Sequence, residues 1–412
     1  MNTLATGHTP EQIRRYNLGL VLRRIRVHRK ISRQRLSEIT HLTKTSVSDI
    51  VNELLGLGLI AERGEDVASS RGGRKPIILS TVMDSCYAIG VVMRRNLIST
   101  VFLNLAGDIV ARKTTILKSG LTEKSILRIA SRCISDIIKK TKEDSRVLGI
   151  GVAAPGPVDV GRGIILDLPD LESPQTVNIK EALTQKFGMP VFVESVPMAG
   201  AVGEYCHRRY SGIPVRDLIF IEIDEGIGCG IISDGNPIHG KNSPGEIGHM
   251  IVEVEGAPCS CGRKGCLCQY ASGTAVLKRL NLAEMDGKDI IVAKKADFSK
   301  LLSHVIEECE TGKRSYLSTI DKAARYLGIA IVNIFALLSP DMLVVSSSIP
   351  GFAELYWKSL LSYMSEDKIL NRTSRRMVLS SYGPDAIAAG AACMVLQAFF
   401  DDPRRLLRTP TI

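Results

Sequence analysis

The chain has 412 residues, 45% of them hydrophobic, and a formal net charge of +10. This length exceeds one ordinary core, so we expect two or three domains, and the hydrophobic content is that of a globular protein. The polar, Arg-rich beginning is unlike a signal peptide, and the longest apolar run that we identify, 328–338, is too short to span a membrane. We therefore expect a soluble cytoplasmic protein with no membrane contact.

Positive charge is concentrated at the beginning of the chain. Residues 1–80 contain fourteen Lys and Arg against seven Asp and Glu, a net +7 of the +10 of the whole chain. A basic head on a nearly neutral body indicates a module that binds a polyanion.

The same 80 residues have the pattern of a winged helix-turn-helix domain. Ser32 and Thr43 are placed to cap the second and third of three short helices, and two strand-like segments then enclose a polar loop. The alternative is a helical interaction domain with a solvated basic face, but charge, helix spacing and wing agree on DNA. The expected elements are helices at 10–29, 32–40 and 44–58 and strands at 59–62 and 75–80.

We expect the third helix to read the major groove, because its first turn exposes short polar side chains. The loop carries basic residues around Gly72 and Gly73, which makes a flexible cationic arm suited to a narrow minor groove. The predicted DNA-contacting residues are Lys44, Thr45, Ser46, Ser48 and Asn52 on the helix and Arg71, Arg74 and Lys75 in the wing.

From Cys86 the pattern changes to strands followed by helices, and it occurs twice. Such a repeat predicts an α/β architecture of two lobes with a ligand cleft between them. We place the first lobe at 81–200 and the second at 201–412, with the C-terminal helix 384–400 packing back towards the first lobe.

Four of the ten cysteines lie within residues 259–268. Thiolates and an imidazole are the usual ligands of a structural zinc ion, and Gly262 and Gly265 permit the tight turns that such a knuckle needs. We therefore predict zinc rather than a loop of scattered buried thiols, with Cys268 as a spare thiol. The other six cysteines stand alone and are expected to be reduced core residues. The predicted ligands are His249, Cys259, Cys261 and Cys266.

Three segments together resemble the ROK family, which contains bacterial repressors and sugar kinases with one actin/hexokinase-like core. The GEIGH turn at 245–249 with the zinc knuckle resembles the family signature, as do the loops GVAAPGPVD at 151–159 and GIGCGI at 226–231. The head, with SRQRLSEITHLTKTSVS followed by GRKP, resembles the DNA-binding head of the repressors, which the free-standing kinases lack. The resemblance covers about 86–400 in the body, and it implies a winged helix-turn-helix domain joined to a bilobal actin/hexokinase-like body.

The residues that a ROK kinase uses are altered in this chain. The resemblance places the catalytic aspartate at Val196, which cannot accept a proton. It places the phosphate turns at 91–95, which has no glycine, and at 346–348, where three serines replace three glycines. Asp224 lies in a third turn and repels phosphate. We therefore expect no catalytic residue and no enzymatic activity.

The resemblance also places the contacts to a sugar. Glu246 and His249 are retained, whereas Ser195, Val196 and Cys268 replace the family's Asn, Asp and Glu. Because hydrogen-bonding sites reject ligands that leave polar groups unpaired, we expect an effector that is less hydroxylated than glucose or differently shaped. Its expected contacts are Ser195, Glu246 and His249, the last with one ring nitrogen on zinc. The alternative is a vestigial pocket in which Glu246 supports the zinc turn.

We thus predict a transcriptional regulator, a repressor of carbohydrate-related genes. It is expected to bind double-stranded operator DNA as a homodimer or homotetramer and to respond to a sugar or sugar derivative. One alternative is a residual ROK sugar kinase, which a coupled ATPase assay distinguishes. The other is a repressor controlled by a protein partner, for which small molecules would give no thermal stabilisation.

Overall fold

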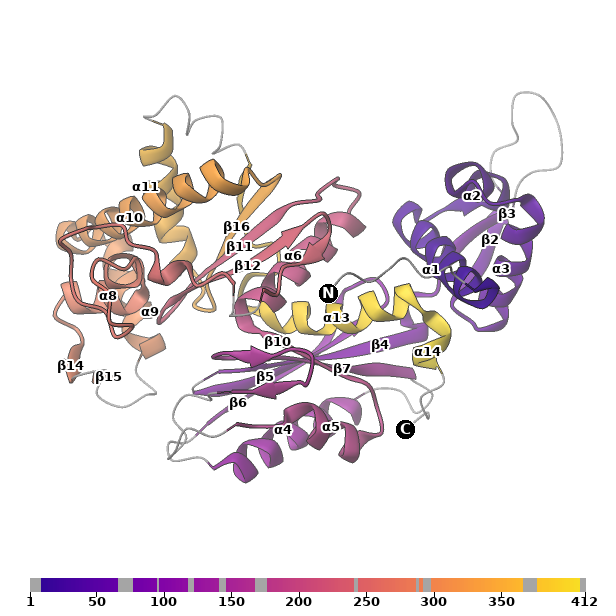
Figure 1. Ribbon diagram of the computed structural model, residues 1–412, viewed down its shortest axis with the longest axis horizontal. Helices are drawn as coiled ribbons and strands as arrows, with labels where there is room; N and C mark the ends of the chain where they lie inside the picture. Colours follow the sequence, from indigo (N-terminus) through magenta and orange to yellow (C-terminus); the bar gives the residue numbers. More distant parts are fainter. Residues whose placement is uncertain are drawn as a thin grey trace.

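The computed structural model describes residues 9–65, 77–94, 96–117, 122–140, 146–166, 176–240, 244–286, 289–291, 298–365 and 376–407. Within these residues the chain forms a small head beside a body of two α/β lobes (Figure 1). Each lobe is built on its own five-stranded sheet, so the predicted α/β body of two lobes is confirmed.

Three helices and a small antiparallel sheet, in the strand order β1-β3-β2, form the head. The hydroxyls of Ser32 and Thr43 accept hydrogen bonds from backbone amides three residues later, as helix caps do. The wing at 66–76, with Arg71, Arg74 and Lys75, lies outside the described residues. The head elements are α1 (Pro10–His28), β1 (Ile31–Ser32), α2 (Arg33–Thr40), α3 (Lys44–Gly56), β2 (Ile60–Glu65) and β3 (Ile77–Thr81).

The first lobe has a mixed sheet in the order β10-β7-β4-β5-β6, with parallel pairing in the first half and antiparallel pairing in the second. Helices α4 and α5 cover one face of this sheet and α13 the other (Figure 1). The elements are η1 (Met83–Ser85), β4 (Cys86–Met93), β5 (Leu97–Asn104), β6 (Ile109–Ile116), α4 (Glu123–Ile138), β7 (Arg146–Ala154), β8 (Val158–Asp159), β9 (Ile164–Ile165), α5 (Ile179–Phe187) and β10 (Val191–Ser195).

The second lobe has a sheet in the order β13-β12-β11-β16-β17 and a set of helices packed against it. Its elements are β11 (Leu218–Ile223), β12 (Ile227–Ser233), β13 (Asn236–Pro237), η2 (Ile247–His249), α7 (Cys268–Ala271), α8 (Gly273–Arg279), β14 (Glu284–Asp286), β15 (Asp289–Ile291), α9 (Phe298–Glu310), α10 (Arg314–Leu338), β16 (Met342–Ser346), α11 (Phe352–Ser365) and β17 (Met377–Leu379).

Two central helices, α6 (Val196–Tyr210) and α13 (Ala386–Asp401), connect the parts of the molecule. They approach so closely that a Cβ on Gly390 would lie 1.8 Å from the backbone oxygen of Ala199. Helix α13 rests directly on the first sheet, since a Cβ on Gly151 would lie 1.8 Å from the oxygen of Ala391. Helix α6 contacts the second sheet through β11 and β12, so it lies between the lobes. The short helix η3 (Gly383–Asp385) precedes α13, and α14 (Pro403–Leu407) follows it.

The segment Gly383–Asp401 corrects one sequence prediction. It is long and apolar enough to cross a membrane by length and composition, whereas we identified no such run. Six of its 19 residues are alanines, whose side chains are only weakly apolar, and they separate the larger apolar residues. In the fold it is mostly buried between the first sheet and α6, so it has the position of a core helix.

The head is seated directly on the body. A Cβ on Gly19 of α1 would lie 2.0 Å from the backbone oxygen of Phe400 in α13, and the apolar side chains of head, α6 and α13 form one continuous core. Ion pairs close the edge of this contact, with 3.3 Å between Arg15 and Asp402 and 2.6 Å between Arg404 and Glu53.

Candidate functional site

The thiol cluster is built from a turn and a short knuckle. Gly245 begins the turn with φ 95°, and a Cβ there would lie 2.0 Å from the oxygen of Cys229, so no other residue fits. The knuckle folds back on itself, since the amide of Cys259 donates to the oxygen of Arg263 at 2.8 Å. Gly265 also has a positive φ, of 73°, and lets the backbone pass against Glu253. These glycines bring one imidazole and three thiols together.

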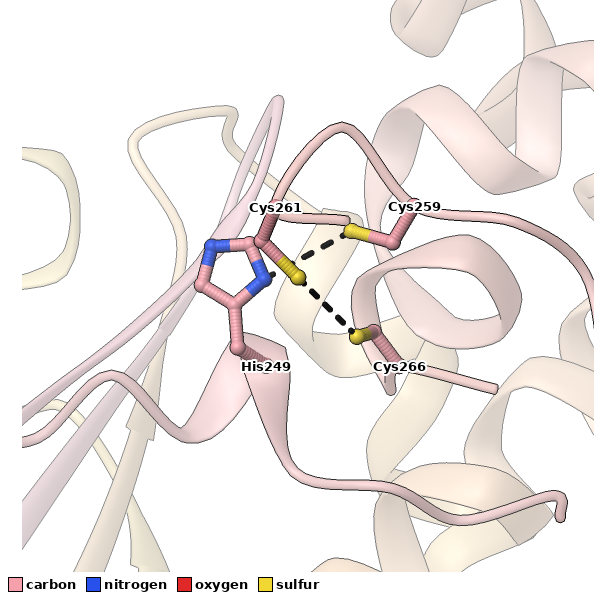
Figure 2. Close-up of side chains that lie close together, drawn as sticks. All are labelled: His249, Cys259, Cys261 and Cys266. Carbon is pink, nitrogen blue, oxygen red and sulfur yellow. Dashed lines mark hydrogen bonds between the residues drawn. The ribbon is translucent and has the colours of Figure 1, made fainter. Parts of the chain in front are cut away.

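The four predicted metal ligands converge (Figure 2). Their ligand atoms all lie within 4.8 Å of one another, with 3.6 Å between Cys259 Sγ and His249 Nδ1 and 3.6 Å between the sulfurs of Cys261 and Cys266. A tetrahedral zinc ion with bonds of about 2.3 Å to sulfur separates its ligand atoms by about 3.8 Å. The donor set and the two separations of 3.6 Å are therefore compatible with a zinc ion.

Cys268 lies against the same cluster, with its sulfur 3.7 Å from that of Cys259. Burial alone would raise the pKa of the Cys259 thiol, but hydrogen bonds from the Cys261 backbone and from neighbouring thiols lower it to about 6. Burial and the adjacent sulfurs raise the pKa values of Cys266 and Cys268 to about 12. A bound cation would compensate the negative charge of further thiolates in this cluster.

A cavity of about 900 Å³ opens between the lobes. The loop that follows β7, the end of β10, the start of α6 and the turn before Glu246 line it. The predicted effector contacts Ser195 and Glu246 lie in its wall, and Val196 is there too, at 6% exposure. His249 lies instead beside a second cavity of about 300 Å³, with Glu246, Cys268 and Lys278.

Two residues that the sequence analysis did not single out join the lobes across the larger cavity. The Oε2 atom of Glu194, at the end of β10, is 2.6 Å from Nε2 of His239, which follows β13. The backbone amide of Ser195 donates to the other Glu194 oxygen at 2.8 Å. The hydrogen bond to Glu194 raises the pKa of His239. Glu194 adjoins Ser195 in sequence, but nothing in the sequence connects it with a histidine 45 residues away.

The positions that the resemblance assigned to phosphate hold an internal ion network. Arg94, at the end of β4, donates to Asp224 at 2.8 Å and to Glu222 through its other Nη. Asp224 also accepts from the Ser347 hydroxyl and from the amide and hydroxyl of Ser348, at 2.7–3.0 Å. Burial raises the pKa of Glu222 to about 7, although Arg94 opposes the rise. The serines that replace the family's glycines thus bind a carboxylate of the chain itself.

In the head, the described DNA candidates lie on the first two turns of α3 and just beyond. Lys44, Thr45 and Asn52 are exposed, whereas Ser46 and Ser48 are half-buried. Arg33, which the sequence analysis passed over, adjoins them: its guanidinium donates to Asn52 Oδ1 at 3.0 Å and pairs with Glu62 at 3.0 Å. Its position directly after the predicted cap Ser32, at the start of the second helix, could have identified Arg33 from the sequence.

The chain is similar to one protein family and to several known proteins. Residues 89–398 match the profile of the ROK family. A xylose repressor of Caldicellulosiruptor bescii is 27% identical over 395 residues, which cover 95% of this chain and 98% of that protein. A glucokinase of Halalkalibacterium halodurans is 28% identical over 322 residues, 76% of this chain and 96% of its own length. The crystal structure of a ROK family transcriptional regulator, a homologue of the E. coli Mlc protein, superposes over 96% of this chain with a TM-score of 0.73 and 22% identity.

Proposed function

Since the chain belongs to the ROK family, we propose that it is a cytoplasmic transcriptional repressor of carbohydrate-related genes. The observation that carries this proposal is the extent of the matches. The match to the xylose repressor covers 95% of the chain and so includes the head. The match to the glucokinase covers only 76% of the chain, although it covers 96% of the glucokinase. The head is therefore the part that this chain shares with a repressor beyond the core of a kinase.

The head binds operator DNA through α3 in the major groove. Lys44, Thr45 and Asn52 face solvent on this helix, and Ser46 and Ser48 stand beside them. Arg33 holds the Asn52 side chain from α2 and adds a cation next to it. Short polar side chains with neighbouring guanidinium groups provide both base and phosphate contacts. The wing residues Arg71, Arg74 and Lys75 belong to this proposal from the sequence alone.

The chain acts as a homodimer or homotetramer. An α3 helix covers one half-site, and two heads related by a two-fold axis read a pseudo-palindromic operator.

A zinc ion held by His249, Cys259, Cys261 and Cys266 supports the cavity. When bound, it supplies the positive charge that stabilises several thiolates at once and ties the turn 245–249 to the knuckle. Glu246 lies in this turn and in the cavity wall, so the metal fixes the position of an effector contact. The ligand spacing of 3.6 Å supports the assignment.

The body binds a sugar or sugar derivative but does not phosphorylate it. Val196 stands in the cavity where the family's kinases carry their base, and its side chain cannot take a proton. Arg94 and Ser348 both donate to Asp224 at the phosphate positions, so a nucleotide would have to break this ion network to enter. Ser195, Glu246, Glu194 and His239 remain as polar groups for the ligand.

The test combines DNA selection with a ligand screen on the full-length protein. A random pool of duplexes should yield a defined sequence, and binding to it should weaken in Asn52→Ala but not in Lys124→Ala, which changes an exposed lysine of α4. Thermal stabilisation by a neutral pentose or hexose should identify the ligand class. Sugar-dependent ATP turnover, or the absence of any selected duplex, would overturn the proposal. Selection of a duplex without any stabilising sugar would place control with a protein partner instead.

A further inference from the structure

Arg26 is a charged residue of the head that is buried in the body. It lies in the last turns of α1 and is 4% exposed. Its guanidinium carbon is 3.4 Å from the ring centroid of Tyr210 and 4.8 Å from that of Phe400. Tyr210 is the last residue of α6, and Phe400 lies near the end of α13. One side chain of the head therefore contacts both central helices of the body.

The guanidinium has no hydrogen-bond acceptor among the described residues, at Nε, Nη1 or Nη2. Gly107 lies next to the guanidinium, since a Cβ there would be 3.3 Å from Nη2. Burying an unpaired charged group is unfavourable, and contacts to aromatic rings return part of that free energy. The Arg26 side chain therefore contributes little to the stability of the docked head. When α1 moves away from the body, water can hydrate the guanidinium again. The cost of burying Arg26 reduces the free-energy difference between the docked and the released head. A small difference allows the head to switch between these two states.

Helix α6 runs from the ligand cavity to this contact. It begins at Val196, in the cavity wall, directly after Glu194 and Ser195. Its fifteen residues span about 22 Å and end at Tyr210. Helix α6 packs closely against α13, since a Cβ on Gly203 would lie 2.8 Å from the Cα of Gly390. A displacement at its first turn is carried to its last turn by the helix as a whole.

We propose that Arg26 is a positioning residue for operator binding, which couples the head to the ligand cavity through α6. A ligand that shifts the start of α6 moves the Tyr210 ring relative to Arg26 and so changes the placement of α1 and of α3 behind it. The coupling is reciprocal, so DNA that selects one head position alters the cavity end of α6. This inference rests on the proposed function, because it assumes that the head binds DNA and that the cavity binds a ligand.

Reciprocity allows a test that needs no identified effector. The probe is a DNA duplex that the wild-type protein selects from a random pool. Hydrogen–deuterium exchange of peptides covering 194–201 and 238–240 is compared with and without this duplex. In the wild type we expect exchange rates there to change by about fivefold or more on DNA binding. In Arg26→Met, which keeps the apolar stem and removes the guanidinium, the change should be lost while the duplex still binds at saturating concentration.

The control Arg23→Met lies one turn earlier on α1 and removes another contact between head and body, the ion pair with Asp401 at 2.5 Å. It should retain the response, as should Tyr210→Phe, which keeps the ring. Tyr210→Leu should lose it, and it provides the second test if Arg26→Met does not fold. A response that is absent in the wild type, or equal in wild type and Arg26→Met, overturns the inference. Failure of the wild type to select any duplex instead refutes the proposed function.

Discussion

Removal of Arg94 tests the ion network between the lobes. Arg94→Met leaves Glu222, at 7% exposure, and Asp224 facing each other without their shared cation. Breaking a buried ion pair by removing one partner costs about 3–5 kcal/mol, because the remaining charge is buried and uncompensated. We expect a loss of this size in the unfolding free energy of the second lobe at pH 8.

The loss should depend on pH, with a sign that follows from Glu222. Its folded pKa of about 7 lies above its ordinary value of 4.5. Its contribution to stability is therefore fully present below pH 4.5 and is lost as pH rises through 7, about 3 kcal/mol in all. Arg94 lowers this pKa, so Arg94→Met raises it further. At pH 6 Glu222 takes up a proton and becomes neutral, and the variant should recover part of its stability.

The single tryptophan, Trp357, provides the assay because it lies in α11 of the second lobe. Its fluorescence during urea unfolding at pH 6 and pH 8 reports the lobe that contains Glu222. Arg216→Met is the matched control, since it removes an exposed ion pair with Asp234 in the same lobe, and no measurable change is expected. Adding Glu222→Gln to Arg94→Met should abolish most of the pH dependence. A loss in Arg94→Met below about 1 kcal/mol, or one that is equal at both pH values, would refute this account of the network.

Three further predictions concern the metal, the packing of α13 and the head. Purified protein should contain about one zinc per chain, which Cys261→Ser loses and Cys268→Ser keeps; metal loss in both would put the spare thiol among the ligands. Gly151→Ala should destabilise the protein by about 1–3 kcal/mol in thermal or urea unfolding, because its Cβ would meet the backbone of α13, whereas Gly56→Ala has open space and should not. Lys44→Ala should reduce the slope of log affinity for the selected duplex against log salt by about 0.9, and an unchanged slope would exclude a phosphate contact.

Local patterns predicted the elements and the thiol cluster well. Ser32 and Thr43 cap helices as expected, since a cap is decided by residues within one turn. The predicted ligands His249 and Cys266 are 17 residues apart, and the glycines between them indicated how the chain returns. Both the helix caps and the thiol cluster are formed by residues that are close in sequence.

Contacts between distant segments were not predictable. Arg94 donates a hydrogen bond to Asp224, which is 130 residues away in sequence. From the sequence we saw only that Arg94 replaces part of a glycine-rich turn and that Asp224 would repel phosphate. The hydrogen bond between Glu194 and His239 depends likewise on how the lobes face each other. Such pairings follow from tertiary packing, for which a single sequence carries no periodic signal.

The seating of α1 on α13 has a consequence for synthesis of the protein. Gly19 and its neighbours pack on Phe400, so α1 receives this part of its partner surface only after α13, much later in the chain, has been synthesised. A prematurely terminated chain lacks α13 and α14, and it exposes apolar surface on α1 and on the first sheet that the complete protein covers. We expect such a fragment to be a substrate for chaperones and proteases. We therefore expect the head to take the position described above only in chains that contain α13.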